Sequence, residues 1–317
     1  MRWFEDRTKG APPQAAPTGQ GQEVPGSAAR KAEPGAPPVG TGAFAVGTGA
    51  FTAGTENFAA GTGNSAPGAG HGPLTPAEME EFAEFRRVKK AEELRRRLQM
   101  IDHTLLKQTA TREDIRKLCA EAREIGFYSV CVQPVYVAAC NTFLKDAPQV
   151  KIACVVGFPM GENVTPVKVY ETKRAVADGA DEIDMVICIS AVKNGDYAYV
   201  KREIKKVVRA AQGRPVKVIL ETSLLTREEM VRAAECARDA GAAFVKTSTG
   251  YFGGGAKAED VRLLKQTVRG ACLVKASGGI RTAQDLLTME QAGADRIGTS
   301  AGVAIAQSLR SDDTPGA

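Results

Sequence analysis

Histidine is scarce in this 317-residue sequence, which contains only His71 and His103. Catalytic zinc sites usually draw on several histidine or cysteine ligands, and the sequence has no Cys-X-X-Cys pair either. We therefore expect neither a bound metal nor another cofactor.

Long apolar runs are also missing. No stretch of 18 apolar residues occurs, and the first residues, MRWFEDRTKG, lack the apolar core of a signal peptide. The seven cysteines are an odd number scattered through apolar segments, as in a reduced chain that uses cysteine as a small hydrophobe. We expect a cytoplasmic protein with no membrane partner.

Neither sign of charge is in large excess. The formal net charge is +5, with basic and acidic residues mixed along the chain, which does not predict a nucleic-acid partner. The densest basic run, RRVKKAEELRRR at 86–97, contains two glutamates on a helical pattern. We interpret it as a solvated helix face rather than a polyanion site.

Large apolar residues are few in residues 1–73, which hold 15 of the 33 glycines and 9 of the 16 prolines. Such a segment cannot bury enough surface to offset its chain entropy, so we expect a disordered extension. It contains a seven-residue repeat, VGTGAF at 39–44 and again at 46–51, whose phenylalanines are either weak contacts for a partner or a product of neutral repeat expansion. The other 244 residues, 74–317, match the roughly 250 residues of a (β/α)8 barrel.

A helix is predicted to begin at Thr75, where TPAE combines a capping box with proline at the first helical position. Apolar residues then recur every three or four positions, which predicts an amphipathic helix. We expect its apolar face to cover one end of the next domain or a partner subunit. These apolar residues are Met79, Phe82, Phe85, Val88, Ala91, Leu94 and Leu98.

Eight short apolar runs follow, separated by helical stretches. They are nearly continuously apolar, as parallel strands covered on both faces must be. The pattern predicts a closed (β/α)8 barrel, or TIM barrel. An open doubly wound sheet is the alternative, but no GxGxxG follows the first run. The runs span 100–104, 129–134, 151–158, 182–187, 216–222, 244–248, 273–277 and 296–300.

Two lysines occupy matching frames, Lys246 in FVKTS and Lys275 in LVKAS. Neighbouring strands with the same frame place these lysines side by side, where burial and a second ammonium lower the pKa of one of them. A neutral lysine forms an iminium with a carbonyl, and the iminium accepts electrons when a C–C bond breaks. Asp102 and Asp184 lie in strands where they can move protons. The alternative is that each lysine forms a structural ion pair with one aspartate.

Glycine-rich turns follow the last three runs, at TG (249–250), SGGIR (277–281) and IGTSAG (297–302). Glycine lets backbone N–H groups approach an anion closely, and barrels frequently bind phosphate at these strands. Three such turns in succession predict a phosphate site to which Ser300 and Arg281 add donors. A turn with no ligand is the alternative reading for any one of them.

Two other polar side chains are not expected to carry the chemistry. His103 has the opposite strand parity to Asp102, so we expect it to point away from the barrel interior and to form a structural hydrogen bond. Cys131 lies on a strand that borders the expected site, but no histidine is placed to act as its base.

Six motifs in order, IDHTLL, EIDMV, KVILET, FVKTSTG, VKASGGIR and RIGTSAG, resemble those of deoxyribose-phosphate aldolase over residues 76–308. The resemblance implies a class I aldolase on a (β/α)8 barrel. It implies reversible cleavage of 2-deoxy-D-ribose 5-phosphate to acetaldehyde and glyceraldehyde 3-phosphate, without metal. The same resemblance implies that Lys246 forms the Schiff base, that Lys275 perturbs its pKa, and that Asp184 and Asp102 belong to the proton relay.

The resemblance also implies the substrate pocket. Thr104, Lys217 and Thr249 match polar pocket positions, although Lys217 lies too deep in its strand to be chosen on spacing alone. Ala301 stands where some members have a second serine. Family members are commonly dimers, so we expect a homo-oligomer that takes a small sugar phosphate. The phosphate-binding turns match Gly250, Gly278, Gly279, Gly298 and Ser300.

Three alternatives remain open from the sequence. The first is another Schiff-base barrel, such as a transaldolase-like or ketose-phosphate aldolase. The second is a barrel that binds phosphate without covalent chemistry and that would tolerate Lys246→Met. The third is a binding or scaffold protein whose working part is the repeat within residues 1–73.

Overall fold

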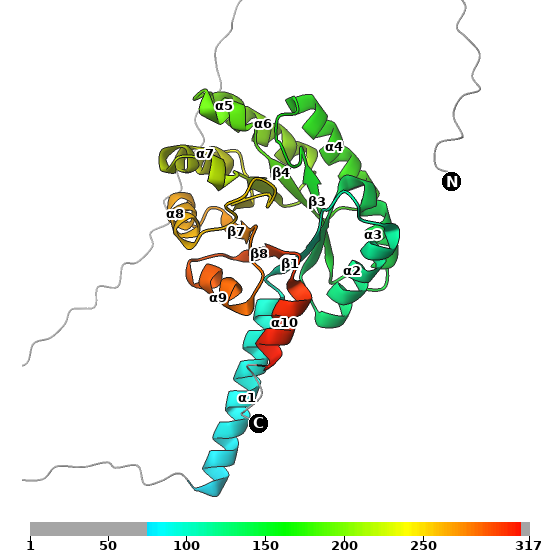
Figure 1. The fold of residues 1–317 in the computed structure, drawn as a ribbon, viewed down its shortest axis with the longest axis vertical. Coiled ribbons are helices and arrows are strands. Elements are labelled where there is room, and N and C mark those ends of the chain that lie inside the picture. The colour runs from blue at the N-terminus through cyan, green and yellow to red at the C-terminus, as the bar shows by residue number, and fades with distance from the viewer. Residues whose placement is uncertain (1–74, 312–317) are drawn as a thin grey trace, which may run out of the picture. The chain divides into compact units, whose positions relative to one another are not determined.

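Eight parallel strands close into a barrel in sequence order, and the last pairs with the first. The computed structural model describes residues 75–311, so the predicted extension, its repeat and His71 lie outside the described residues. The predicted closed barrel is confirmed, and the open sheet is excluded (Figure 1). The strands are β1 Ile101–Leu105, β2 Ser129–Val132, β3 Lys151–Val156, β4 Glu182–Val186, β5 Val216–Ile219, β6 Phe244–Lys246, β7 Leu273–Ser277 and β8 Arg296–Thr299.

Helices alternate with the strands and surround the barrel (Figure 1). The capping box predicted at the start of α1 is present, α7 begins with a second one, and α2 and α9 begin with the same box built on aspartate. The helices are α1 Pro76–Leu98, α2 Arg112–Ile125, α3 Val137–Phe143, α4 Thr165–Asp178, α5 Ile189–Lys193, α6 Tyr197–Ala210, α7 Arg227–Asp239, α8 Ala258–Val268, α9 Ala283–Gln291 and α10 Gly302–Ser311, with short 3-10 turns η1 Pro134–Tyr136 and η2 Thr222–Leu224.

The main hydrophobic core lies between the strands and the helices. Strand residues such as Ile101, Ile183 and Val218 are fully buried within it. The barrel interior contains a small apolar cluster of Leu106, Cys131, Ala153 and Val155, with Phe158 packed against it. Because side chains alternate along a strand, every second residue of β1 and β4 faces this interior. Charged side chains also point into this interior, and they form the candidate site.

Most strands end one to three residues before the end of the apolar run that predicted them. The run at 244–248, for example, is a strand only as far as Lys246. Thr247 and Ser248 are still buried, but they already belong to the loop that follows. The apolar pattern therefore continues past the strands because the first residues of the site loops are buried as well.

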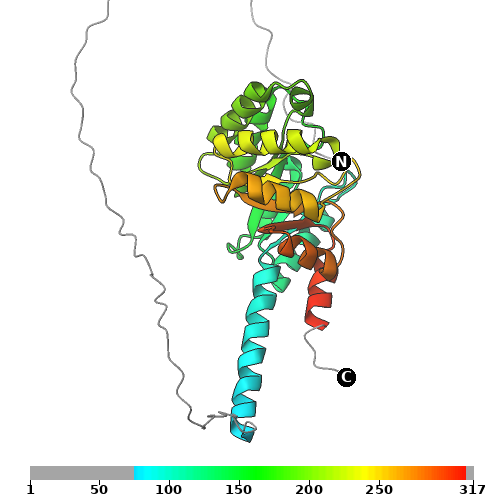
Figure 2. The same cartoon turned by 90° about the vertical axis from the view of Figure 1, so that its left-hand side faces the viewer.

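The helix predicted from Thr75 is confirmed as α1, but its predicted cover over the barrel is confined to its last turns. Leu98 is buried and Leu94 is packed against the core, and Arg96 and Arg97 pair with Glu290 of α9. The earlier part of α1 extends away from the barrel (Figure 2). Its large apolar side chains are about half exposed, namely Met79, Phe82, Phe85 and Val88.

The spacing of these apolar residues explains the exposure. Most of them follow one another at intervals of three residues. Three residues turn a helix by about 300°, so each side chain falls about 60° behind the one before it. The apolar positions therefore wind around α1 instead of forming one face.

Within residues 75–311, no helix is both long enough and apolar enough to cross a bilayer.

Candidate active site

The two lysines in matching frames meet across neighbouring strands. The register of β6 and β7 pairs Lys246 directly with Lys275, as the frames predicted. The register of β4 and β5 pairs Asp184 with Lys217 in the same way. All four side chains point into the barrel and are almost completely buried.

Asp184 is the centre of the cluster. Its Oδ2 accepts hydrogen bonds from Lys246 Nζ and from Lys275 Nζ, each at 2.8 Å. Its Oδ1 accepts one from Lys217 Nζ at 2.7 Å. A single carboxylate therefore contacts three lysines, which fixes their amino groups close to one another.

A second layer of charge lies against the first. Asp102 of β1 accepts hydrogen bonds from Lys275 and, at 2.9 Å, from Nη1 of Arg296 on β8. Glu182 of β4 pairs with Lys217 at 2.7 Å and with Arg296 at 3.3 Å. Arg296 and Glu182, neither of which was predicted as a site residue, thus belong to the charged network.

Their positions carried a signal that strand parity could have used. Glu182 is two residues from Asp184 on β4, so the two side chains share the inward face. Arg296 begins β8, two residues before Gly298, and it lies over the ring of Tyr128 at 3.5 Å. Choosing Asp184 alone ignored the second inward residue of the same strand.

The pKa values of the lysines in the cluster are shifted in opposite directions. Burial lowers the pKa of Lys246, and the positive charge of Lys275 lowers it further, whereas the single contact with Asp184 opposes both. Burial also disfavours the charged form of Lys275, but Asp102 and Asp184 outweigh it and raise the pKa of Lys275. Lys246 is therefore the amine that most easily becomes neutral, and Lys275 remains an ammonium.

The carboxyl groups respond in the opposite direction. Burial acts to raise the pKa of Asp184, but Lys217, Lys246 and Lys275 overcome it and hold that pKa well below the ordinary value. The surrounding cations lower the pKa of Asp102 in the same way. Both aspartates are therefore ionised at neutral pH and accept hydrogen bonds from the lysines.

A cavity of about 350 Å³ opens above this cluster at the C-terminal ends of the strands. Among the three lysines of the cluster, only Lys246 lines it, so only this amine can reach a molecule bound there. Lys217, Lys275 and the two aspartates lie beneath. The cavity is also lined by most of the residues predicted for the pocket and the phosphate site, namely Thr104, Thr249, Gly250, Gly278, Gly279, Gly298, Ser300 and Arg281.

The glycine turns pack against one another at the edge of this cavity. Gly278 has φ of 89°, a left-handed conformation that favours glycine, and a Cβ there would lie 3.0 Å from the Cα of Gly255. The same added atom would lie 3.4 Å from the Cα of Gly250. The loops after β6 and β7 therefore approach as closely as they do because side chains are absent.

The two side chains set aside on sequence grounds lie as expected. His103 points out of the barrel, where its Nε2 lies 2.8 Å from Glu121 and its ring packs against Phe127. Cys131 is buried in the barrel interior, where burial raises the pKa of its thiol. Among residues 75–311, no group of histidine, cysteine and acidic side chains is arranged to hold a metal ion.

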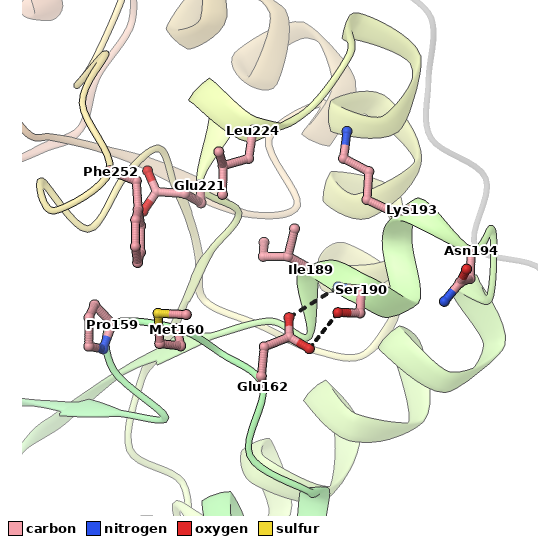
Figure 3. Close-up of a pocket in the computed structure, with 10 residues that line it drawn as sticks. All are labelled: Pro159, Met160, Glu162, Ile189, Ser190, Lys193, Asn194, Glu221, Leu224 and Phe252. Carbon is pink, nitrogen blue, oxygen red and sulfur yellow. Dashed lines mark hydrogen bonds between the residues drawn. The ribbon is translucent and has the colours of Figure 1, made fainter.

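A second cavity, of about 470 Å³, lies beside the first and is formed by the loops after β3, β4, β5 and β6 (Figure 3). Its wall is mainly apolar, with Met160, Ile189, Leu224 and Phe252. Glu162 accepts a hydrogen bond from the Ser190 hydroxyl at 2.6 Å in this wall (Figure 3). Glu221, for which no role was predicted, also lines this cavity.

Comparison with known proteins agrees with this geometry. Residues 96–308 match the model of the DeoC/LacD family aldolases. A deoxyribose-phosphate aldolase from Thermococcus gammatolerans is 55% identical over 213 residues, covering 66% of this chain and 95% of the relative. One from Halalkalibacterium halodurans is 54% identical over 215 residues, covering 68% of this chain and 96% of the relative.

Solved structures give the same result. A putative deoxyribose-phosphate aldolase from Coccidioides immitis superposes with a TM-score of 0.67 at 40% identity, covering 73% of this chain and 97% of that one. The deoxyribose-phosphate aldolase from Aeropyrum pernix, described as tetrameric, superposes with a TM-score of 0.66 at 35% identity, covering 72% of this chain and 96% of that one. The chain therefore belongs to the DeoC/LacD aldolase family, among its deoxyribose-phosphate aldolases.

Proposed function

We propose that this lyase cleaves 2-deoxy-D-ribose 5-phosphate reversibly into acetaldehyde and D-glyceraldehyde 3-phosphate, through a Schiff base on Lys246. One observation carries the assignment of the nucleophile. Lys246 is the lysine of the buried cluster that lines the cavity, and it is also the one whose pKa is lowered. A neutral amine that a substrate can reach is what attack on an aldehyde requires.

The proposed reaction begins when the neutral Nζ of Lys246 attacks C1 of the open-chain sugar. Loss of water gives an iminium at C1. The hydroxyl on C3 then gives up its proton, the C2–C3 bond breaks, and its electron pair moves to the iminium, which becomes an enamine. Glyceraldehyde 3-phosphate leaves, C2 takes a proton, and hydrolysis of the new iminium releases acetaldehyde and restores the lysine.

The buried charges support the proton transfers. Lys275 Nζ is 2.8 Å from the carboxylate that also contacts Lys246, and it contacts Asp102 on its other side. Asp102, Lys275 and Asp184 therefore form a continuous path along which a proton can move toward Lys246. We assign these three residues to the relay. Lys217 balances the charge on Asp184 from below.

The glycine turns after β6, β7 and β8 are proposed to hold the phosphate. They line the same cavity as Lys246, which suits a chain of five carbons with an aldehyde at one end and a phosphate at the other. Gly250, Gly278, Gly279 and Gly298 allow close approach of the backbone to the anion, and Ser300 adds a hydroxyl.

Borohydride trapping tests the proposal. We would incubate the protein with acetaldehyde, reduce it, and locate the adduct by peptide mass. An ethyl group on Lys246 that is missing in Lys246→Met establishes the Schiff base and the nucleophile together. An adduct on Lys275 or Lys217 would keep the reaction class but overturn the assignment. A folded protein with no adduct and no turnover would instead be a barrel that binds phosphate without covalent chemistry.

A panel of aldehydes separates this activity from that of other Schiff-base barrels. The proposal requires acetaldehyde as the donor and glyceraldehyde 3-phosphate as a preferred acceptor. Efficient turnover of a ketose phosphate, with none of 2-deoxyribose 5-phosphate, would contradict it.

We also propose that the enzyme is a homo-oligomer that acts in the cytoplasm. All seven cysteines lie in the described residues and are free thiols, as is usual in a reducing compartment. Static light scattering of the full chain measures its mass, and a mass equal to one chain at micromolar concentration would contradict the proposed assembly.

A further inference from the structure

Glu221 is a buried acidic residue that lies outside the lysine cluster. It follows β5, and only 1% of its surface is exposed. No basic side chain within residues 75–311 forms an ion pair with it. Its backbone has φ of 55° and ψ of 65°, the left-handed region that residues other than glycine rarely adopt. Strain of this kind persists only where surrounding contacts impose it.

The contacts of Glu221 lead to Thr249, in the loop after β6. Glu221 Oε2 accepts the backbone N–H of Thr249 at 3.1 Å and also accepts the Thr249 hydroxyl. The chain on either side of Glu221 is held to the end of β6 and to the start of this loop, because Leu220 N–H donates to Lys246 O at 2.9 Å and Thr222 N–H to Thr247 O at 3.0 Å. The strained backbone thus directs the carboxylate at Thr249.

The hydrogen bonds of Thr249 determine what its hydroxyl can offer a substrate. A hydroxyl group has one proton to donate and two lone pairs to accept with. The proton of Thr249 goes to Glu221, and one lone pair accepts the backbone N–H of Tyr251 at 3.1 Å. The remaining lone pair can only accept. Thr249 lines the cavity that contains Lys246 and the glycine turns.

Glu221 itself lies in the wall between the two cavities. Figure 3 shows its side chain between Leu224 and Phe252, on the side of the apolar cavity. Its carboxylate contacts the lining of the substrate cavity through Thr249. Glu221 does not itself line the cavity that contains Lys246, so we assign it an indirect role.

We propose that Glu221 is a positioning residue that fixes the Thr249 hydroxyl as a hydrogen-bond acceptor, and that Thr249 thereby favours acceptor aldehydes carrying a hydroxyl next to the aldehyde carbon. Thr249 shares its cavity with the amine at one end of the substrate and with the phosphate turns at the other. The hydroxyls between these ends are the groups it can meet. The inference rests on the proposed function, because it takes Lys246 as the point of attachment.

The test compares two acceptors in the condensation with acetaldehyde. One is D-glyceraldehyde 3-phosphate, and the other is 3-phosphooxypropanal, which lacks only the hydroxyl. Glu221→Met removes the acceptor for Thr249 and frees its proton. We expect kcat/KM to fall about tenfold for the hydroxylated aldehyde, the worth of one hydrogen bond, and less than about threefold for the other. Equal losses on both aldehydes would overturn the proposal.

Glu221→Gln is the matched variant. Its amide oxygen can take the position of Oε2 and accept both hydrogen bonds of Thr249, so the proposal needs a hydrogen-bond acceptor but no negative charge. We expect this variant to recover most of the preference that Glu221→Met loses. A loss in Glu221→Gln as large as that in Glu221→Met would mean that the charge itself acts, and the proposal would be wrong.

Variants of Thr249 test the same proposal independently if Glu221→Met does not fold. Thr249→Ser keeps the hydroxyl and should retain the preference for the hydroxylated aldehyde, whereas Thr249→Val should lose it. The double variant Glu221→Met with Thr249→Val should be no worse than either single variant, because both remove one contact. Additive losses would contradict the shared role.

Borohydride trapping in the same preparations tests the Schiff base on Lys246 separately from the role of Glu221. If wild-type protein and Glu221→Met both form the reduced adduct on Lys246, the Schiff base is intact and the aldehyde comparison decides the role of Glu221. If wild-type protein forms no adduct, the proposed function fails, and the role of Glu221 fails with it.

Discussion

The charges at the bottom of the barrel do not balance when every group is ionised. Four cationic side chains, Lys217, Lys246, Lys275 and Arg296, face three carboxylates. One lysine must lose its proton for the cluster to be neutral, and burial favours that outcome. Lys246 contacts one carboxylate, whereas each of the other cations contacts at least two. The cluster therefore selects Lys246 as the neutral amine.

Replacing Lys275 by methionine tests this selection through the pH dependence. Lys275 lowers the pKa of Lys246, so its removal raises that pKa and leaves less neutral amine at a given pH. The neutral form is the nucleophile, so activity rises with pH through the pKa of Lys246. We expect the acid limb of kcat/KM to move to higher pH and activity at pH 7 to fall at least about tenfold.

A matched surface variant controls for the loss of a lysine. Lys257→Met removes an exposed side chain that pairs with Glu259, and it should leave the profile unchanged. If Lys275→Met lowered the rate without moving the acid limb, Lys275 would act in proton transfer alone.

Lys217 is predicted to matter for stability as well as for charge balance. Its Nζ lies 2.7 Å from both Glu182 and Asp184. Lys217→Met leaves these buried carboxylates with fewer partners, and we expect the free energy of unfolding in urea at pH 7 to fall by about 3 kcal/mol. Lys193→Met, which breaks an exposed pair with Glu229, should change it by less than about 1 kcal/mol. Unchanged stability in Lys217→Met would show that the carboxylates do not depend on this lysine.

At the scale of the elements, the sequence predicted the strands and their order, because each is a short buried run between helix caps. It also predicted that Lys246 and Lys275 are neighbours, since the same sequence pattern on two adjacent parallel strands places the two lysines at the same level in the barrel. It did not predict the depth of the charged network. Strand parity places Glu182 and Arg296 on the inward face, but it does not show that the two meet, because their contact joins strands far apart in the chain.

Loop contacts were the other part that could not be predicted. Glu221 lies within the apolar run at 216–222, but its partner Thr249 lies 28 residues further on. The contact depends on the left-handed backbone conformation of Glu221, and a glutamate in the sequence does not predict that conformation. Nothing local in the sequence therefore linked the two residues.

The turn after β7 gives a prediction about close backbone packing. Gly278→Ala combines φ of 89° with a Cβ 3.0 Å from Gly255 and 3.3 Å from Ser248. The loops must separate, so we expect KM for 2-deoxyribose 5-phosphate to rise about tenfold, which is the effect of losing roughly one charge-assisted contact to phosphate. The effect should be smaller on 2-deoxyribose, which has no phosphate.

A second glycine isolates the effect of strain alone. Gly126, at the end of α2, has φ of 87°, and nothing lies within 4 Å of its added Cβ. Gly126→Ala should destabilise the fold by about 1 kcal/mol and leave KM unchanged. If both alanines changed KM equally, the turn after β7 would not be the phosphate site.

At the scale of the whole molecule, all of the proposed chemistry is confined to the barrel. The charged cluster and its cavity draw on strands and loops between Asp102 and Ser300. The helix before the barrel is anchored to it only through its last turns, where Leu94 and Leu98 pack and two arginines pair with Glu290. The family match likewise begins at residue 96. Neither the geometry nor the family assignment draws on residues before α1.

Deleting residues 1–73 tests whether the barrel is the complete catalytic unit. The deletion leaves Thr75 in place, so the capping box with Glu78 at the start of α1 is kept. We expect kcat/KM for 2-deoxyribose 5-phosphate to stay within about twofold of the value for the full chain, because no described contact of the site is removed. A change of about 1.4 kcal/mol in the activation free energy would instead alter the rate about tenfold. Trapping on Lys246 in both proteins provides the control for active-site content. A tenfold loss of kcat/KM per trapped active site would place part of the function in residues 1–73. That result would support the hypothesis of a scaffold protein.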